Sequence, residues 1–301
     1  CEYNPGPLLC NFLASPASGL EPFAAVFTGY ADGTNTAGAD YQWDFNADEV
    51  VDLQGVGRRT VTNTYSAGTY SVKLTVATAG ETASCIRSNY VVSAPAILYV
   101  APGGAHVSPF TNWANASTTL QAAVDAAASS SMVWVADGTY VTTAAVSIAK
   151  AVTVRSVHGA PGSTVRRSGA ASHRVFSLMH TNAVIDGFTI ENGAGGVYMH
   201  QGGLVQNCTI RGNTVGDVGG GIHLYQGGVV RSCVIENNST SGDNRGAGVN
   251  LNGGGFVVDC IIRGNSAPSS VGGGAALYGG MVSNCVFYGN SAQRGGGAFL
   301  D

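Results

Sequence analysis

The sequence predicts an all-β protein with two domains, a small β-sandwich followed by a β-solenoid. Glycine provides 44 of the 301 residues, whereas charged residues make up only 11%, and this composition favours β architecture outside the cell. Short runs that alternate apolar and polar residues fill residues 8–93, as expected of sandwich strands. From residue 184 onward the sequence repeats itself every 20–27 residues, which is typical of stacked solenoid rungs.

Composition and charge exclude several function classes. The net charge is −4, and the chain has no basic cluster of the kind that binds nucleic acid. No apolar run approaches the ~20 residues of a membrane-spanning helix. The glycines follow no three-residue period, which excludes collagen. Hydrophobic residues make up 45% of the chain, so a packed core is expected rather than disorder.

Charge and glycine divide the chain into two parts. Residues 1–96 include nine acidic and four basic side chains, whereas residues 97–301 include nine acidic and ten basic side chains. Glycine is concentrated in the second part, and a segment of Ser, Ala and Pro at residues 93–96 marks the joint. We therefore expect a first domain at residues 1–94 and a second at residues 95–301.

The first domain is expected to contain six short strands. Residues 69–76 alternate most clearly, with Tyr70, Val72, Leu74 and Val76 on one face of a strand. Several such strands separated by turn signals indicate a small β-sandwich. The expected strands are Asn11–Ala14, Ala24–Thr28, Tyr41–Phe45, Arg59–Tyr65, Gly68–Ala77 and Ser84–Val92.

Two segments of this domain resemble a known family. The residues YQWDF at 41–45, TY at 64–65 and AGTYSVKLTV at 67–76 are similar to the YxWDFGDG strand and the HTYxxxGTYxVxLTV hairpin of polycystic kidney disease (PKD) domains. This chain departs from the pattern after WDF, where it has Asn46-Ala47-Asp48-Glu49. The resemblance implies an Ig-like sandwich with Trp43 as its core anchor. It also implies an extracellular spacer or interaction module, as found on surface proteins and polysaccharide-degrading enzymes.

The first domain contains three cysteines. Cys10 lies in the expected first strand and Cys85 in the last. Because the first and last strands of such sandwiches are often neighbours, we expect a Cys10–Cys85 disulfide, with two free buried thiols as the alternative. Closing a loop of ~75 residues would stabilise the fold by several kcal/mol. Cys1 suits either the lipid attachment of a bacterial lipoprotein or a structural role, and membrane contact is expected only through such a lipid.

An acidic segment of the first domain has the spacing of a calcium loop. Oxygen-bearing side chains recur at alternate positions, as calcium loops require. However, Glu49 stands where the EF-hand type needs glycine, and Gly55 stands where it needs glutamate. The alternative is a polar loop closed by Asx turns. The candidate calcium ligands are Asp44, Asn46, Asp48 and Asp52.

The second domain opens with a strand at Ile97–Val100 and a short helix. The segment Thr118–Gln121 predicts a capping box at the start of this helix, which is expected to end near Ala128. Leu120, Ala123, Val124 and Ala127 give the helix one apolar face. After it we expect a turn at residues 136–140 and strands at Met132–Val135, Val146–Ile148, Val152–Arg155, Val175–Leu178 and Ala183–Ile185.

Five related units then repeat along the chain. They begin at Val184, Leu204, Val229, Phe256 and Met281, and each of the last four is followed by an asparagine, a glycine-rich turn and another short strand. Stacked rungs place equivalent side chains in columns. We expect one inward column of Phe188, Cys208, Cys233, Cys260 and Cys285, with the four cysteines reduced. We expect a second column, an amide ladder, of Asn213, Asn238, Asn265 and Asn290.

The second domain also resembles known proteins. Residues 119–127 and 133–140 are similar to the N-terminal cap of pectate-lyase-like right-handed parallel β-helices. The IxxN, FxxN and GGGA/I units resemble repeats of chlamydial polymorphic outer membrane proteins and related bacterial surface β-helices. The resemblance implies a right-handed parallel β-helix. It does not fix an activity, because this fold hosts lyases, hydrolases, epimerases, tail spikes and adhesins.

Several charged residues are candidates for catalysis. Arg211 and Arg263 could act as a base or a uronate clamp of a lyase, but they alternate with acidic residues from rung to rung and so also fit an ion-pair ladder. Asp186 and Asp259 lie three rungs apart, roughly 14 Å by strand spacing, too far to act as a hydrolase pair. Asp217 and Asp243 lie in loops of adjacent rungs and could form an acid pair or a calcium site; two exposed loop aspartates are the alternative.

The strand after each glycine turn offers a further candidate site. Alternation along these strands predicts an outward strip of rings and amides, which suits stacking against sugars and hydrogen bonding to them. Exposed strands also favour Tyr and Asn without any ligand. The candidate glycan-binding residues are Tyr198, His200, His223, Tyr225, Asn250, Asn252 and Tyr278.

These observations predict a secreted or surface-displayed bacterial protein with a structural or adhesive role. The alternative function is a polysaccharide lyase or glycoside hydrolase of the β-helix type. Asp301 falls inside the strand of a repeat unit, so the solenoid is expected to lack a C-terminal cap. An open last rung exposes unpaired backbone groups. We therefore expect either the remainder of a longer solenoid or head-to-tail self-association, which propagates into a filament when its rotation does not close.

Overall fold

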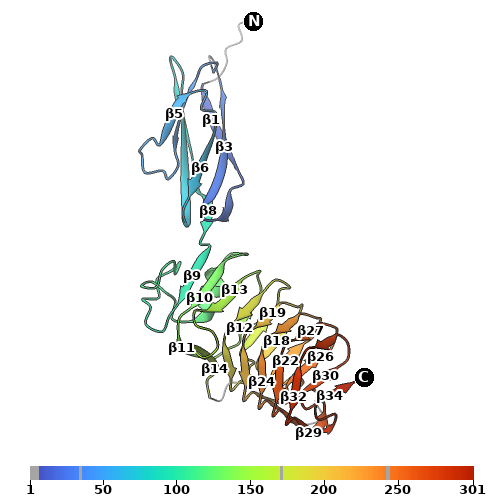
Figure 1. Ribbon diagram of the computed structural model, residues 1–301. Helices are drawn as coiled ribbons and strands as arrows, with labels where there is room; N and C mark the ends of the chain where they lie inside the picture. The colour runs from blue at the N-terminus through green and yellow to red at the C-terminus, as the bar shows by residue number, and fades with distance from the viewer. Residues whose placement is uncertain (1–6, 34–35, 170–171, 242–244) are drawn as a thin grey trace. The chain divides into compact units, whose positions relative to one another are not determined.

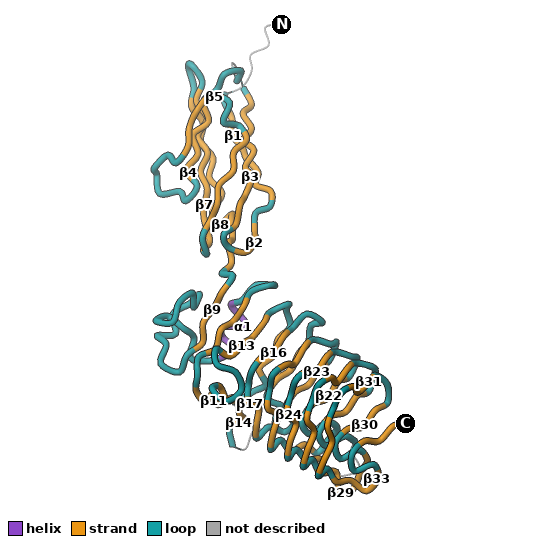
Figure 2. The backbone as a smooth tube through the Cα atoms, in the orientation of Figure 1, coloured by secondary structure: helices purple, strands orange, loops and turns teal. Residues whose placement is uncertain are grey.

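The computed structural model describes residues 7–33, 36–169, 172–241 and 245–301 (Figure 1). The chain divides into two compact units, Cys1–Ala96 and Ile97–Asp301. Apart from one short helix, the regular structure of both units consists of strands in the described part of the chain, and Figure 2 draws this helix in purple. That helix is too short to cross a membrane, and no other described helix could do so. Cys1 lies outside the described residues.

The first unit is a sandwich of two sheets, as expected. The three-stranded sheet is antiparallel and follows the order β1 (Leu9–Ser15), β3 (Phe23–Asp32) and β6 (Thr60–Tyr65). The five-stranded sheet follows the order β2 (Ser18–Leu20), β8 (Thr82–Ala94), β7 (Gly68–Ala77), β4 (Asp40–Asp44) and β5 (Leu53–Val56). Strands β2 and β5 were not expected, because three or four residues that include a glycine are too short to show alternation.

Aromatic side chains fill the core of this sandwich. Trp43 is fully buried, and its indole Nε1 donates a hydrogen bond to the Arg58 carbonyl at 2.8 Å. The ring of Phe12 meets Trp43 edge-on at 5.5 Å between centroids, and Phe27 packs at 5.6 Å. A large buried ring with its polar atom satisfied contributes strongly to a core. Trp43 therefore has the anchoring position that the sequence indicated.

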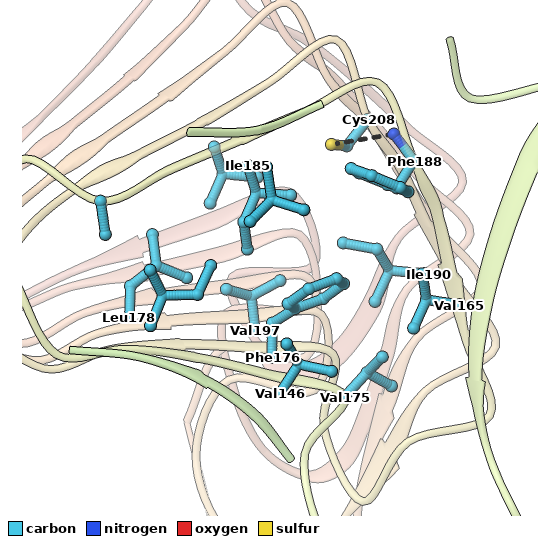
Figure 3. Packing of buried hydrophobic residues seen from close by; sticks show 14 of the residues in the cluster. Val146, Val165, Val175, Phe176, Leu178, Ile185, Phe188, Ile190, Val197 and Cys208 are labelled. Atoms are coloured by element: carbon cyan, nitrogen blue, oxygen red, sulfur yellow. Dashed lines mark hydrogen bonds between the residues drawn. The ribbon is translucent and has the colours of Figure 1, made fainter. Parts of the chain in front are cut away.

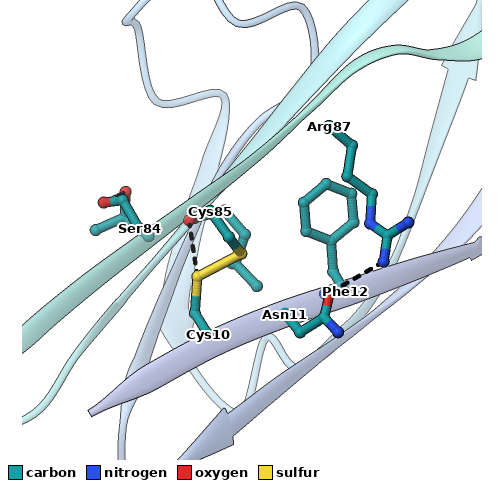
Figure 4. The surroundings of a disulfide bond; sticks show 8 residues. Cys10, Asn11, Phe12, Ser84, Cys85 and Arg87 are labelled. Carbon is teal, nitrogen blue, oxygen red and sulfur yellow. Dashed lines mark hydrogen bonds between the residues drawn. A yellow bond between two sulfur atoms is a disulfide. The ribbon is translucent and has the colours of Figure 1, made fainter. Parts of the chain in front are cut away.

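A disulfide joins Cys10 to Cys85 (Figure 4). Cys10 lies in β1 of the three-stranded sheet and Cys85 in β8 of the five-stranded sheet, so the bond links the two layers of the sandwich. The two Cα atoms are 5.9 Å apart, and 75 residues separate the cysteines in sequence. The bond therefore closes a loop that contains most of the unit.

The second unit is a right-handed parallel β-helix of about 7 turns. Three long parallel sheets form its walls, and consecutive rungs contribute consecutive strands to each. The first sheet contains β9 (Ile97–Val100), β10 (Met132–Val135), β13 (Thr153–Ser156), β16 (Val184–Asp186), β19 (Leu204–Gln206), β23 (Val229–Arg231), β27 (Phe256–Val258) and β31 (Met281–Ser283). The second contains β11 (Gly138–Thr142), β14 (Ser163–Arg167), β17 (Thr189–Glu191), β20 (Thr209–Arg211), β24 (Val234–Glu236), β28 (Ile261–Arg263) and β32 (Val286–Tyr288).

The third sheet follows the glycine turns, and a fourth, shorter sheet precedes them. The third contains β12 (Val146–Ile148), β15 (Phe176–Leu178), β18 (Val197–Met199), β22 (Ile222–Leu224), β26 (Val249–Leu251), β30 (Ala275–Leu277) and β34 (Ala298–Leu300). The fourth contains β21 (Thr214–Val215), β25 (Ser239–Thr240), β29 (Ser266–Val271) and β33 (Ser291–Arg294). The fourth sheet was not expected, because its strands are short and polar. Strands β11 and β14 were also missed, and β11 occupies the segment expected to be a turn.

The helix α1 (Leu120–Ala126) buries its apolar face on the solenoid core, as expected. Its N-cap is Thr119, whose side chain accepts a hydrogen bond from the Ala122 amide, so the predicted cap at Thr118 was wrong by one residue. Gln121 does not close a capping box. Its Oε1 instead accepts a hydrogen bond from the Ser147 amide in β12 at 2.8 Å, which fastens the helix to the third sheet.

The inward column of the solenoid is confirmed. Phe188, Cys208, Cys233 and Cys260 are buried, and Cys285 is half-buried. Figure 3 shows Cys208 above Phe188, whose amide donates to the Cys208 sulfur at 3.4 Å. All four cysteines are free, and burial raises the pKa of the Cys233 thiol. The hydrogen bond with Cys233 instead lowers the pKa of the Cys260 thiol. Because Cys208, Cys233 and Cys260 are shielded from solvent among apolar side chains, the column is a packing element.

The asparagine ladder is also confirmed. Asn213, Asn238 and Asn265 are fully buried. Each side-chain Nδ2 donates to the Oδ1 of the asparagine on the next rung at 2.9–3.0 Å. The Oδ1 atoms of Asn238, Asn265 and Asn290 also accept from the backbone amide of the asparagine on the preceding rung, and Asn213 Oδ1 accepts from the Gly193 amide. The ladder therefore satisfies buried polar groups on every rung that it crosses.

Candidate functional site

The outer surface of the third sheet differs from the strip that the sequence predicted. His223 is only 7% exposed and Asn250 only 2%, so the prediction that both face solvent was wrong. The glycine turns cover them: a Cβ on Gly219 would lie 2.7 Å from the Cβ of His223, and one on Gly246 would lie 3.0 Å from the Cα of Asn250. Only a turn without side chains can pack this closely on a sheet.

One row of the predicted strip stays accessible. Tyr225 is 38% exposed, Asn252 is exposed, and His200 and Tyr278 are half-buried. Each of these residues directly follows its third-sheet strand, and backbone hydrogen bonds keep them in register from rung to rung. Successive side chains are therefore about 4.8 Å apart. We call His200, Tyr225, Asn252 and Tyr278 the tyrosine row.

Four rings meet at one end of this row. The rings of His200 and Tyr225 stack at 5.5 Å between centroids with 27° between their planes. Tyr198 packs against the buried His223 at 5.3 Å and against Tyr225 at 6.3 Å. Because β18 and β22 pair in register, the rings form two cross-strand pairs. They give the surface a rigid aromatic platform.

Arg174 holds this platform in place, and sequence reasoning missed it. Its guanidinium lies 5.7 Å from the Tyr198 ring centroid. Its two terminal nitrogens donate to the carbonyls of Val218 and Gly219, at 2.6 and 2.9 Å. The arginine reaches these carbonyls because the intervening residue is Gly195, where a Cβ would lie 2.6 Å from Nη1. No repeat position marks Arg174, since glycines occupy the equivalent place on the next two rungs.

Burial sets the electrostatics of the platform. It lowers the pKa of His223 to about 4, with the nearby Arg174 charge acting in the same direction and Asp217 opposing. Burial also raises the pKa of Tyr198. Among the residues that the structure describes, the Nε2 atom of His223 has no hydrogen-bond partner. His223 is therefore neutral near pH 7 and acts as a buried packing ring.

The shifted pKa of His223 predicts a pH-dependent stability. Above pH 6.5 this histidine is neutral in both folded and unfolded chains. Between pH 6.5 and 4 only the unfolded chain binds the proton, so acidification should lower the free energy of unfolding by about 2–3 kcal/mol. Urea unfolding at pH 7.5 and 4.5 measures the loss. The variant His223→Asn carries the residue that occupies this place on the next rung, Asn250, and should show a smaller loss of stability on acidification. The control His158→Asn replaces an exposed histidine and should show the same loss as the unmodified chain. If all three proteins lose the same stability between pH 7.5 and 4.5, His223 is not the group responsible.

Tyr278 and Asn252 lie apart from the ring cluster. Arg245 lies over the Tyr278 ring at 4.2 Å, and Phe299 packs beside it at 6.3 Å. These residues border a cavity of about 400 Å³. The tyrosine row thus has an aromatic group at both ends and an amide, Asn252, between them.

The catalytic candidates on the second sheet are engaged in ion pairs. Arg211 contacts Glu191 at 3.0 Å. Arg263 contacts Glu236, with its Nε at 2.6 Å, and donates to the Tyr288 hydroxyl at 2.6 Å. The expected ladder is therefore present, and neither guanidinium is free of a local partner.

The aspartates do not come together as a catalytic pair in the part of the chain that the structure describes. Asp217 is exposed in its loop, and Asp243 lies outside the described residues. Asp186 is buried and contacts Arg155. The strand of Asp186 lies three strands away from the one that precedes Asp259, which is exposed. Across the described ranges no three His, Cys, Asp or Glu side chains are placed to hold a metal ion.

The expected calcium segment of the first unit is closed by backbone hydrogen bonds. The Asp44 carboxylate accepts bonds from the amides of Asn46, Asp48 and Glu49, at 2.9–3.3 Å. The Asp52 carboxylate accepts one from the Phe45 amide at 2.7 Å. This is the geometry of the Asx-turn alternative, in which the carboxylate oxygens stabilise the loop itself.

Comparison with known proteins identifies the second unit. A family model described as "Right handed beta helix region" matches residues 135–300. No curated protein and no solved structure matches the chain significantly. The family match does not extend to the first unit. Because it spans more than half of the 301 residues, the chain belongs to the right-handed β-helix family.

Proposed function

We propose that this chain is an extracellular structural and adhesive module, secreted or displayed on a bacterial surface, that binds glycans along the tyrosine row. The observation that carries the proposal is the stacked pair of His200 and Tyr225, with Tyr225 open to solvent. Aromatic faces attract the apolar C–H faces of sugars, and a nearby amide can bond to hydroxyl groups. The row offers both, in a line along the solenoid.

Binding is favoured over cleavage by the surroundings of the charged residues. Hydrolysis of a glycosidic bond usually requires two carboxyl groups about 5–9.5 Å apart. Glu191 and Glu236 are held by arginines on the second sheet, and the tyrosine row consists of rings and an amide. This arrangement favours recognition of a sugar over hydrolysis by a pair of carboxyl groups.

The first unit supports an extracellular location. Its resemblance to PKD domains suggests a spacer or interaction module, and disulfides persist in oxidising compartments. The Cys10–Cys85 bond fits that environment. We therefore assign the first unit the role of a spacer for the glycan-binding solenoid.

Replacing Tyr225 with alanine should weaken glycan binding about tenfold, because one stacking ring is worth up to ~1.5 kcal/mol beyond its buried area. The ligand is first selected on an array of neutral and acidic oligosaccharides, and its affinity is then measured by calorimetry. Tyr288→Ala removes a comparably exposed tyrosine from the second sheet and should leave the affinity unchanged. Equal affinities of the Tyr225 variant and the unmodified chain would exclude the row.

The same proteins test the alternative enzymatic function. Polysaccharides incubated with the chain should be recovered at their original length. Robust release of unsaturated or reducing products would show that the chain is a lyase or hydrolase instead of an adhesive module.

A further inference from the structure

One edge of the sandwich in the first unit is open. Strand β6 is an outer strand of the three-stranded sheet and pairs only with β3 (Figure 1). In an antiparallel pair, every second residue directs its amide and carbonyl away from the partner strand. The Gly29 amide donates to the Arg59 carbonyl at 2.8 Å, so the odd-numbered residues of β6 bond to β3. The amides and carbonyls of Thr60, Thr62 and Thr64 therefore point to the free edge, where no other described strand pairs with them.

The opposite edge of the same sheet is covered by side chains. The Phe12 amide of β1 donates to the Asn11 side chain at 2.8 Å, and the Ala14 amide donates to the Tyr90 hydroxyl at 3.0 Å. The disulfide of Cys10 also ties this strand to β8. Exposed edges are commonly protected by charged side chains, proline or bulges, whereas β6 contains only Thr, Val, Asn and Tyr. Its edge is therefore accessible to another strand.

A cavity of about 410 Å³ lies directly beside this edge, and Thr62, Asn63 and Thr64 of β6 border it. Leu53 of β5 and the ring of Tyr70 also line it. Side chains of a strand alternate between the two faces of a sheet. Every second side chain of a strand added to β6 would therefore point to the same side as Asn63 and enter the cavity.

The cavity combines an apolar wall with one negative charge. Among the residues that line it, Asp52 is the only one that is charged at neutral pH, and its Oδ2 accepts a bond from the Phe45 amide at 2.7 Å. Burial raises the pKa of Tyr65 to about 12, and the charge of Asp52 acts in the same direction, so this lining phenol stays neutral. Lysine and arginine have an aliphatic stem and a cationic end. Such a side chain matches the apolar wall with its stem and the Asp52 carboxylate with its charge.

We propose that the free edge of β6 binds an extended peptide segment as an additional antiparallel strand, with one lysine or arginine side chain in the cavity and its cationic end at Asp52. The backbone groups of Thr60, Thr62 and Thr64 provide the affinity, and the cavity provides the specificity. This inference goes beyond the proposed glycan binding, because it gives the first unit a protein partner of its own.

A second copy of the chain fits this edge less well than a basic peptide. If two β6 strands paired about a two-fold axis at Thr62, each strand would present Val61 and Asn63 to the cavity side of the other. No side chain of β6 carries a positive charge, so β6 of the other copy would offer no partner to either Asp52 carboxylate. The charge in the cavity therefore favours a basic segment over self-pairing.

The probe is the fluorescently labelled peptide Thr-Val-Thr-Lys-Thr-Val-Thr, and its binding to the full chain is measured by fluorescence anisotropy. In an antiparallel pair, directly opposite side chains share a face. The peptide's threonines would therefore bond to the edge, while its valines and lysine would face the cavity side. N-methylation of the two central threonines should abolish binding, whereas N-methylation of the two valines, whose amides face away from β6, should leave it unchanged. Norleucine in place of lysine should weaken binding about tenfold, because a bond to a charged group is lost.

Substitutions in the protein test the same contacts. Asp52→Asn keeps an oxygen for the Phe45 amide and should weaken binding of the lysine peptide about tenfold, without affecting the norleucine peptide. Asp32→Asn removes an exposed acid at the end of β3 and should affect neither. Thr62→Pro removes the central amide donor at an edge where proline is tolerated, and it should abolish binding, whereas Thr62→Val, which keeps the donor, should not. A thermal melt verifies that each variant is folded.

Several outcomes would overturn the proposal. Failure of the probe to bind the unmodified chain at millimolar concentration would do so directly. Equal affinities of the two N-methylated peptides would exclude strand addition, and equal losses in Asp52→Asn and Asp32→Asn would indicate general charge attraction. A concentration-dependent dimer of the chain that Thr62→Pro abolishes would show that the edge pairs with a second copy instead.

Discussion

Replacing Asn265 with alanine is expected to lower the free energy of unfolding of the solenoid by about 3 kcal/mol. Asn265 Oδ1 accepts bonds from the backbone amide and the side-chain Nδ2 of Asn238. Its own Nδ2 donates to the Ile235 carbonyl and to Asn290 Oδ1. Asn238 Nδ2 still donates to the Ile210 carbonyl, and Asn290 Oδ1 still accepts from the backbone amide of residue 265. The Asn238 amide and the Ile235 carbonyl lose their bond to this side chain in the buried interior, and most of the cost comes from these two groups.

Urea unfolding of the full chain measures this loss, and hydrogen exchange of peptides that span β24 and β28 locates it. Asn252→Ala is the matched control, because Asn252 is an exposed asparagine of the same solenoid. It should change stability by less than about 0.5 kcal/mol. If both variants unfold at the same urea concentration, the ladder does not stabilise the rungs.

The second large effect is expected in the first unit. Replacing both Cys10 and Cys85 with alanine should lower its free energy of unfolding by about 4 kcal/mol, since the native bond closes a loop of 75 residues. Trp43 is fully buried in the core of that unit. Hydrogen exchange of peptides that contain Trp43 therefore measures the unfolding of the first unit separately from that of the solenoid.

A reducing agent provides the control for this prediction. It should destabilise the first unit of the unmodified chain to the level of the double variant and leave the double variant unchanged, because the four solenoid cysteines are free. A further loss of stability in the reduced double variant would reveal another disulfide. Unchanged stability of the double variant in oxidising buffer would show that the Cys10–Cys85 bond does not limit unfolding.

The repetition of the sequence explains which parts of the fold could be predicted. A residue type that recurs once per rung must occupy equivalent places, so the columns that contain Cys233 and Asn238 were visible as a period. The strands β11 and β21 were not visible, because β11 begins with a glycine that directly follows an aspartate and so matches a turn signal, whereas β21 has only two residues. A short polar strand is fixed by its neighbours in the stack and leaves no alternation of its own.

The candidate sites show a different limit of sequence reasoning. Alternation along a strand tells which side chains leave the core, and it assigned His223 and Asn250 to the outer face. It does not tell whether a neighbouring turn covers that face, and here the turns at Gly219 and Gly246 do. Arg174 was missed for a different reason. Glycines occupy the equivalent place on the next two rungs, so no column of the repeat contains this arginine.

The placement of the disulfide has a mechanical consequence for the first unit. Tension that enters and leaves the first unit at its two ends can extend only the segments outside the covalent loop. The 75 residues between the bonded cysteines would otherwise add about 250 Å of extended chain. The disulfide keeps this loop closed, so these residues do not extend even when the sandwich unfolds. Under load the first unit therefore behaves as a short, nearly inextensible tether, and reduction of one bond converts it into a long and compliant one.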